Sequence, residues 1–92
     1  MTLEEATEMQ KEVPSWEVLD EGQAIRRIFV FANHHEVLAF VNAVAWISHR
    51  EDHHPHQEVG YSRCLIAYST HAVEGLTEND FICAAKVDAL LE

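Results

Sequence analysis

The chain has 92 residues, of which 48% are hydrophobic and only three are glycine. This composition predicts one globular domain over residues 1–92 and excludes the disordered and low-complexity classes. The formal net charge is −10 and stays negative even with all seven histidines protonated, so a phosphate backbone would be repelled and we expect no direct binding of nucleic acid.

The N-terminal third predicts a helix followed by a pair of strands. Residues 1–13 have the pattern of a short acidic helix, which ends before Pro14 because the residue preceding a proline avoids helical backbone angles. The acidic character of this segment does not match a secretory signal, so we expect a cytoplasmic protein. Two strand-like runs follow at 16–21 and 24–31, and the turn between them at Gly22 predicts a hairpin.

The middle of the chain predicts the longest helix. Asn33 and Glu36 form a variant capping box just before the apolar-rich run 37–47, so we expect the helix to begin there. Pro55 must finish the helix, which leaves the two histidines that precede the proline at the exit from the helix. The apolar run is too short to cross a bilayer, so we expect no membrane contact.

The last third predicts a second pair of strands and a C-terminal helix. The runs 57–61 and 64–70 have strand character and turn at Ser62. Thr77 and Asp80 have the N-cap and N3 spacing of a capping box before a periodic apolar run. The order α-β-β-α-β-β-α therefore predicts an α+β fold, a four-stranded antiparallel sheet with three helices packed on one face.

Several side chains are expected to pack in the core or at an interface. Six aromatic residues have helical or strand spacing, which favours packing over chemistry: Trp16, Phe29, Phe31, Phe40, Trp46 and Phe81. Cys64 and Cys83 lie in apolar patterns without metal or redox spacing, so we expect buried thiols. The strand at 24–31 carries Ile28 and Val30 on its other face, and this surplus of apolar surface predicts a homo-oligomer, a dimer or a tetramer.

Five of the seven histidines gather in one segment, between residues 49 and 80. In order and with its spacing, the pattern is His49, three residues, His53-His54-Pro55, five residues, Tyr61, nine residues, His71, eight residues and Asp80. This order resembles the signature of the pterin-4a-carbinolamine dehydratases. The similarity extends over most of the chain, from about Trp16 to Thr77, and implies the same α+β fold and a pterin substrate.

The resemblance implies an enzyme that removes water from a 4a-hydroxytetrahydropterin. The 4a-hydroxyl leaves as water and N5 loses a proton, which gives the quinonoid dihydropterin and recycles the pterin for an aromatic amino-acid hydroxylase. Histidine suits both proton transfers because its side chain donates or accepts a proton near pH 7. His53, His54 and His71 match the family's catalytic histidines and Asp80 matches its acidic residue. These four are the expected catalytic residues, but their spacing does not distinguish acid from base, and the family implies no cofactor.

Further residues of the signature and its surroundings are expected to contact the pterin or line its pocket: His49, Pro55, Tyr61, Ser69 and Thr70. The backbone at the last two ends a strand, where amide and carbonyl groups remain unpaired and can hydrogen-bond a flat ring. The chain departs from the family pattern at three positions that hold histidine here: His34, His49 and His56. The family often has an acidic residue at position 49, so a carboxylate that would favour the protonated form of nearby histidines is missing.

Other readings of the same residues remain open. His49 and His53 have the spacing of a metal-binding pair on one helix face, and His71 or a carboxylate could supply a third ligand, although the family uses no metal. Asp80 could simply cap the C-terminal helix. The chain could also be an interaction or assembly protein, because mammalian relatives bind a homeodomain transcription factor and other relatives assist the assembly of enzymes.

Overall fold

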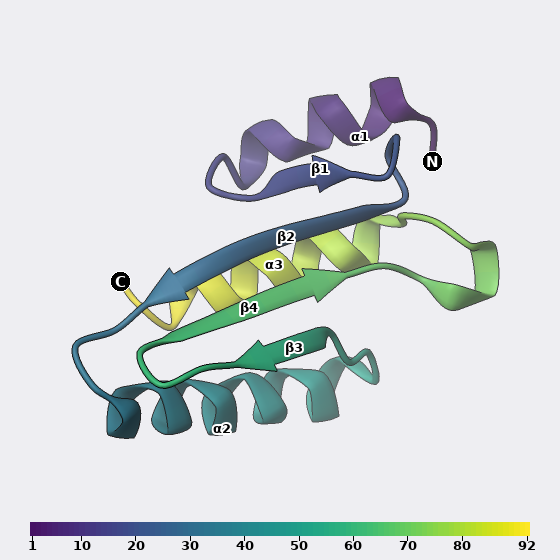
Figure 1. The fold of residues 1–92 in the computed structure, drawn as a ribbon. Helices are drawn as coiled ribbons and strands as arrows, with labels where there is room; N and C mark the ends of the chain where they lie inside the picture. Colours follow the sequence, from purple (N-terminus) through teal and green to yellow (C-terminus); the bar gives the residue numbers. More distant parts are fainter.

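The computed structural model describes residues 1–92 and arranges the helices and strands in the predicted order (Figure 1). The elements are α1 (Leu3–Met9), the 3-10 helix η1 (Gln10–Glu12), β1 (Glu17–Leu19), β2 (Ala24–Val30), α2 (His34–Glu51), β3 (His56–Val59), β4 (Arg63–Tyr68), the 3-10 helix η2 (His71–Val73) and α3 (Glu78–Ala89). None of the helices combines the length and the apolar character needed to span a bilayer.

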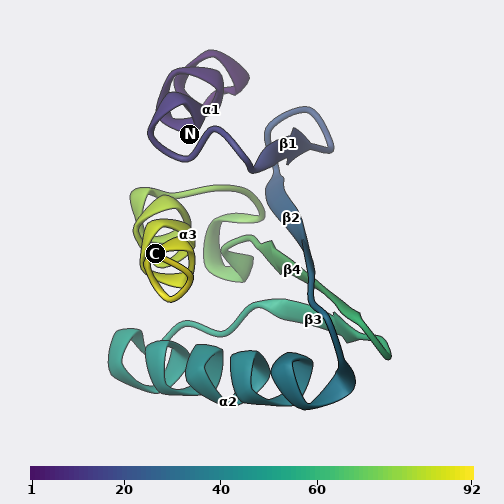
Figure 2. The same cartoon turned by 90° about the vertical axis from the view of Figure 1, so that its left-hand side faces the viewer.

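The four strands form one antiparallel sheet in the order β1-β2-β4-β3. β2 and β4 are the central strands, and their register places Ile25 opposite Tyr68 and Phe29 opposite Cys64. All three α-helices lie on the same face of the sheet, as Figure 2 shows with the sheet seen nearly edge-on. The predicted α+β fold is thus confirmed, including the placement of the helices on one face.

The core lies between the sheet and the helices. The central strands bury alternate residues, as strand periodicity predicts: Ile25, Phe29, Cys64, Ile66 and Tyr68. The two longer helices bury one stripe each: Val37, Phe40, Val44 and Ile47 from α2, and Phe81, Cys83, Ala84 and Val87 from α3. The outer face of β2 leaves Ile28 41% and Val30 77% exposed, so the apolar outer surface expected for this strand is present.

Trp46 is the exception among the six aromatic residues expected in the core, because 64% of it is exposed. Four of the others are buried and Phe31 is partly buried. The stripe of α2 that faces the core includes Val44 and Ile47, and at about 100° per residue the intervening Trp46 points away from it. The ring of Trp46 instead meets His49 edge-on, with the ring centroids 6.0 Å apart. The prediction for Trp46 was wrong because the apolar arc of this helix is wider than the stripe that the core covers.

Local hydrogen bonds set both ends of α2. At its start the side chain of Asn33 accepts the N–H of Glu36 at 2.9 Å, as the capping pattern predicts. At its end Asp52 adopts left-handed backbone angles with φ 50°, a region that aspartate tolerates better than most residues. The N–H of His53 then donates to the carbonyl of Ser48 at 3.1 Å. This reversal fixes the direction in which His53 leaves the helix.

Side-chain contacts hold α3 against the rest of the domain. Asp88 accepts hydrogen bonds from the Trp16 indole at 2.9 Å and from the Arg27 guanidinium at 2.7 Å. Arg27 belongs to β2 and Trp16 directly precedes β1, so this carboxylate connects α3 to both strands of the first hairpin. Lys86 forms an ion pair with Glu51 at the end of α2. The orientation of α3 is therefore fixed from two sides.

Both cysteines are buried, as predicted. Burial raises the pKa of the Cys83 thiol to about 11, and the carboxylates of Glu51 and Asp80 add to this effect. Burial also raises the pKa of Cys64. Because the thiolate is the reactive form, both side chains act as small apolar groups at neutral pH.

Candidate active site

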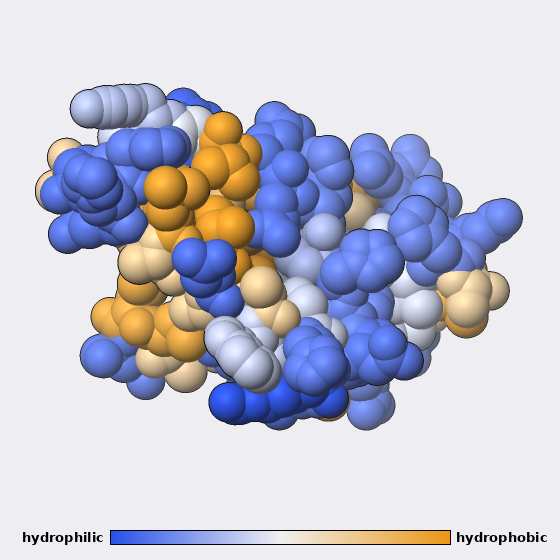
Figure 3. Space-filling model, turned by 90° about the horizontal axis from the view of Figure 1, so that it is seen from below, coloured by the Kyte–Doolittle hydropathy of each residue, from blue (hydrophilic) through white to orange (hydrophobic).

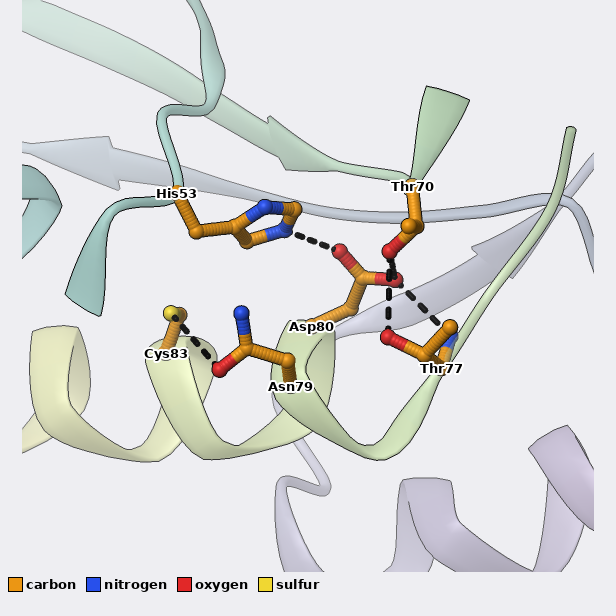
Figure 4. A network of polar contacts seen from close by, with 6 residues as sticks. All are labelled: His53, Thr70, Thr77, Asn79, Asp80 and Cys83. Atoms are coloured by element: carbon orange, nitrogen blue, oxygen red, sulfur yellow. Dashed lines mark hydrogen bonds and ion pairs between the residues drawn. The ribbon is translucent and has the colours of Figure 1, made fainter. Parts of the chain in front are cut away.

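Three segments of the chain meet at one end of the sheet. The loop after α2 carries His53 and His54 and leads into β3. Because β3 and β4 are antiparallel, the start of β3 lies beside the end of β4, after which come residues 69–71. The N-terminal turn of α3 brings Asp80 to the same place, and Figure 4 shows His53, Thr70 and Asp80 converging there. The fold thus gathers polar side chains from segments that are distant in the sequence.

The shortest contact of this group joins His53 and Asp80. The ring nitrogen Nε2 of His53 lies 2.5 Å from Oδ1 of Asp80 (Figure 4). The side chain of Asp80 is fully buried and that of His53 is 14% exposed. Hydrogen bonds to a carboxylate are short and strong, so this contact sets the orientation of the imidazole.

The second oxygen of Asp80 accepts two more hydrogen bonds. Oδ2 receives the backbone N–H of Thr77 at 2.9 Å and the hydroxyl of Thr70 at 2.8 Å. The three donors explain how a carboxylate can be fully buried, since a buried polar group needs its hydrogen bonds satisfied. Asp80 therefore caps α3 and contacts a histidine at the same time. Helix capping and contact with a histidine were the two alternative roles that the sequence left open for this residue.

The partner of His53 assigns its tautomer. An ionised carboxylate only accepts hydrogen bonds, so Nε2 of His53 must be the donor in this contact. In the neutral imidazole the other ring nitrogen, Nδ1, then carries a lone pair and is the one that can accept a proton. This arrangement is suited to a proton acceptor whose ring is held by a carboxylate.

Tyr68 forms the wall against which His53 packs. The two rings are nearly parallel, at 17°, with their centroids 5.5 Å apart. The tyrosine is fully buried, and its hydroxyl makes no hydrogen bond within the chain. Burial raises the pKa of Tyr68 well above its usual range, the nearby Cys83 and Asp80 add to the effect, and the side chain of Ser48 opposes it. The phenol therefore stays neutral and forms a packing surface for the imidazole of His53.

His54 and His71, in contrast, are both exposed. His54 directly follows His53 and precedes Pro55, which is buried. His71 opens η2 and lines a polar hollow of about 210 Å³. Its other lining residues come from the β1–β2 turn and from the segment after β4: Asp20, Gln23, Ala24, Ser69, Thr70, Glu74 and Gly75. Each exposed histidine thus directly follows a residue that hydrogen-bonds to the buried Asp80: His54 follows His53, and His71 follows Thr70.

Two residues of the sequence pattern lie outside this group in the single chain. His49 is exposed on the last turn of α2, beside Trp46. Tyr61 lies in the β3–β4 turn at the opposite end of the sheet, is 71% exposed and stacks on His34 with the rings 5.6 Å apart. No three side chains among His, Cys, Asp and Glu are grouped in the single chain so that they could hold a metal ion, so the alternative of a metal site at His49, His53 and His71 gains no support.

The hydrogen bonds that the two threonine hydroxyls make around Asp80 have no signal in the sequence. Thr77 was predicted only as an N-cap, and Thr70 only through its backbone. The backbone of Thr70 is in fact paired, because its N–H donates to the carbonyl of Gly75 at 2.7 Å and its carbonyl accepts from Gly75 at 3.3 Å. The side chain of Thr70 therefore makes the contact with the site. The strand pattern alone could not reveal this, because the bridge to Gly75 depends on the conformation of the loop between them.

The fold and the site define a class of protein: an α+β domain with a buried carboxylate–histidine pair beside exposed histidines, an arrangement suited to proton transfer. The family model described as pterin 4 alpha carbinolamine dehydratase matches residues 1–90. The chain belongs to this family.

Individual relatives agree with this assignment. A protein of Nitrosospira multiformis that carries the name of the dehydratase is 53% identical over 92 residues, which are all of this chain and 80% of that protein. A protein of the same name from Xanthomonas campestris pv. campestris is 58% identical over 85 residues, covering 92% of this chain and 72% of that one.

Two solved structures share the fold. A transcriptional coactivator/pterin dehydratase from Brucella melitensis superposes with a TM-score of 0.93 at 29% identity and covers 100% of this chain and 98% of that one. A pterin dehydratase-like protein described as a RuBisCO assembly factor of the α-carboxysome has a TM-score of 0.72 at 26% identity, covering 83% and 88%.

The packing of Tyr68 can be tested with two substitutions. Tyr68→Phe removes a buried hydroxyl without a partner and keeps the ring beside His53, so the free energy of unfolding should stay the same or rise by about 1 kcal/mol. Tyr68→Ala should lower it by about 3–5 kcal/mol, because it leaves a cavity. Urea denaturation measures both. A loss of more than about 1 kcal/mol in the Phe variant would show that the hydroxyl has a partner in the folded protein.

Proposed function

We propose that this protein eliminates water from a 4a-hydroxytetrahydropterin to give the quinonoid dihydropterin. The observation that carries the proposal is the buried pair of His53 and Asp80 beside the exposed His54 and His71, in a chain of the dehydratase family. Its relatives carry the name of this activity. The product would return to an aromatic amino-acid hydroxylase in the cytoplasm.

The reaction needs one proton to be added and one to be removed. The 4a-hydroxyl takes up a proton and leaves as water, N5 loses a proton, and the electron pair of the N5–H bond forms the double bond between N5 and C4a. No electrons are exchanged with another molecule, so the balanced reaction requires no redox cofactor. A pair of groups that titrate near neutral pH is sufficient, and histidine is such a group.

We assign the proton transfers to the three histidines and a supporting role to Asp80. His54 and His71 are exposed and can reach a bound substrate. His53 presents Nδ1 as an acceptor, and the carboxylate of Asp80 would stabilise the imidazolium that forms when this nitrogen takes up a proton. The flat pterin would lie near the hollow lined by Ser69 and His71.

Histidine substitutions test the proposal. His54→Ala and His71→Ala should each lower the turnover number by roughly 10² or more, the usual contribution of a general acid or base. His35→Ala is a suitable control, because His35 is exposed near the start of α2, at the far end of this helix from His53. Stopped-flow measurement on 4a-hydroxytetrahydropterin with chelator-treated protein gives the rates.

We expect the wild-type protein and the control to be active in the presence of the chelator, and both variants to be slower by roughly 10² or more. Near wild-type rates in both variants with unchanged circular dichroism would refute the assignment of the two histidines. Activity that disappears with chelator and returns with zinc would instead support a metal-dependent reaction.

We further propose that the chain forms a homo-oligomer. β1 and β3 are the edges of the sheet, and unpaired strand edges favour association. Apolar side chains are exposed on the outer face of β2, and an apolar hollow lies between α2 and the end of α3. Figure 3 shows hydrophobic surface gathered on one side of the molecule in the view from the side of α2. At physiological ionic strength a Debye length of about 8 Å limits the repulsion between acidic copies.

Light scattering at micromolar concentration measures the mass directly. We expect at least twice the chain mass of 10.5 kDa. A mass near 10.5 kDa would contradict the proposal and would mean that the exposed edges and apolar side chains serve another purpose.

The alternative function is that of an interaction or assembly protein. Its support is the exposed apolar surface on α2 and just beyond the end of α3, where Trp46 is 64% and Leu91 49% exposed, and the roles named for the two solved relatives. Large exposed apolar patches are typical of surfaces that bind other molecules. The assay above separates the two functions, because an interaction protein would leave the uncatalysed rate of dehydration of 4a-hydroxytetrahydropterin unchanged.

A further inference from the structure

The hydroxyl of Thr70 occupies the centre of the buried network. Its Oγ1 lies 2.8 Å from Oδ2 of Asp80 and 3.0 Å from Oγ1 of Thr77. Figure 4 shows these contacts on the side of Asp80 that faces away from His53. Thr70 therefore touches the carboxylate through one oxygen while the histidine touches it through the other.

The chemistry of the groups gives the direction of each hydrogen bond. A hydroxyl has one hydrogen to donate, and a carboxylate can only accept. The hydrogen of Thr70 must therefore go to Asp80, and the hydrogen of Thr77 must go to Thr70. The result is a chain of donors that runs from Thr77 to Thr70 to Asp80, with His53 donating from the other side.

This chain holds the carboxylate in one rotation. Asp80 is fully buried, so water cannot replace a lost donor on Oδ2 at low cost. The backbone of Thr70 is itself anchored by two hydrogen bonds to Gly75. With Oδ2 occupied by Thr70 and by the N–H of Thr77, Oδ1 remains directed at Nε2 of His53.

We propose that Thr70 is a positioning residue that sets the orientation of His53 through Asp80. The catalytic consequence rests on the proposed dehydratase function, whereas the orientation itself does not. The hydroxyl already uses its hydrogen, so it donates none to the substrate. Thr70 also directly precedes His71. The same residue therefore holds the carboxylate that orients His53 and anchors the backbone next to His71.

Two substitutions separate this role from a merely structural one. Thr70→Val keeps the branched shape and removes the hydroxyl, and Thr70→Ser keeps the hydroxyl and removes the methyl group. Nitrogen-15 NMR of the His53 imidazole reports its tautomer without any need for activity. Steady-state kinetics on 4a-hydroxytetrahydropterin then gives the turnover number and KM separately.

In the wild-type protein and in Thr70→Ser, the imidazole of His53 should show a single tautomer with the proton on Nε2. Thr70→Val should show a mixture of tautomers, and its turnover number should fall about tenfold or more while KM changes little. A serine variant that restores both the NMR signals and the turnover number would exclude a loss caused by altered packing alone.

A valine variant with unchanged imidazole signals would overturn the proposal. A rise in KM at unchanged turnover number would also overturn it, because the hydroxyl would then bind substrate. If the valine variant does not fold, the wild-type protein still decides: the Thr70 hydroxyl proton should be protected from exchange with water, and its rapid exchange would refute the donor chain. A wild-type protein that shows this network but no dehydration would refute the proposed function and leave the positioning role intact.

Discussion

The buried carboxylate of Asp80 is the point on which the site depends. It contacts the imidazole of His53, the hydroxyl of Thr70 and the backbone of Thr77, which belong to three different segments. A carboxylate without water must have all its hydrogen bonds supplied by the protein, or its burial would cost several kcal/mol. The fold supplies them only when the loop after α2, the end of β4 and the start of α3 all meet. The geometry of the candidate site therefore depends on the packing of these three segments against one another.

This constraint explains why the exposed and buried histidines differ. His53 is held by Asp80 on one side and packs on the ring of Tyr68 on the other, so its orientation is set by the core. His54 and His71 follow directly after anchored residues and turn outward to solvent. A rigid acceptor flanked by accessible proton-transfer groups fits an elimination that must move two protons and no electrons.

Local patterns predicted the fold well because each element carries its own signal. The alternation in β4 and the Thr77 to Asp80 capping spacing are contained within a few residues, and both correspond to what the structure shows. Trp46 was misplaced because a wide apolar arc on a helix does not reveal which stripe the sheet covers. The hydroxyl contact of Thr70 was missed for a related reason. It depends on how the loop to Gly75 folds back, and this is a tertiary property without a periodic signature.

The most direct test of the account is a double-mutant cycle between His53 and Asp80, read from the free energy of unfolding. His53→Ala, Asp80→Ala and the double variant are compared with the wild type by urea denaturation. If the contact orients the site as described, the two losses should fall short of additivity by about 1.5 kcal/mol or more, since hydrogen bonds to charged groups contribute about 1.5–3 kcal/mol. Losses that add to within about 0.5 kcal/mol would show that the two side chains do not interact in the folded protein, and the account of the site would fail.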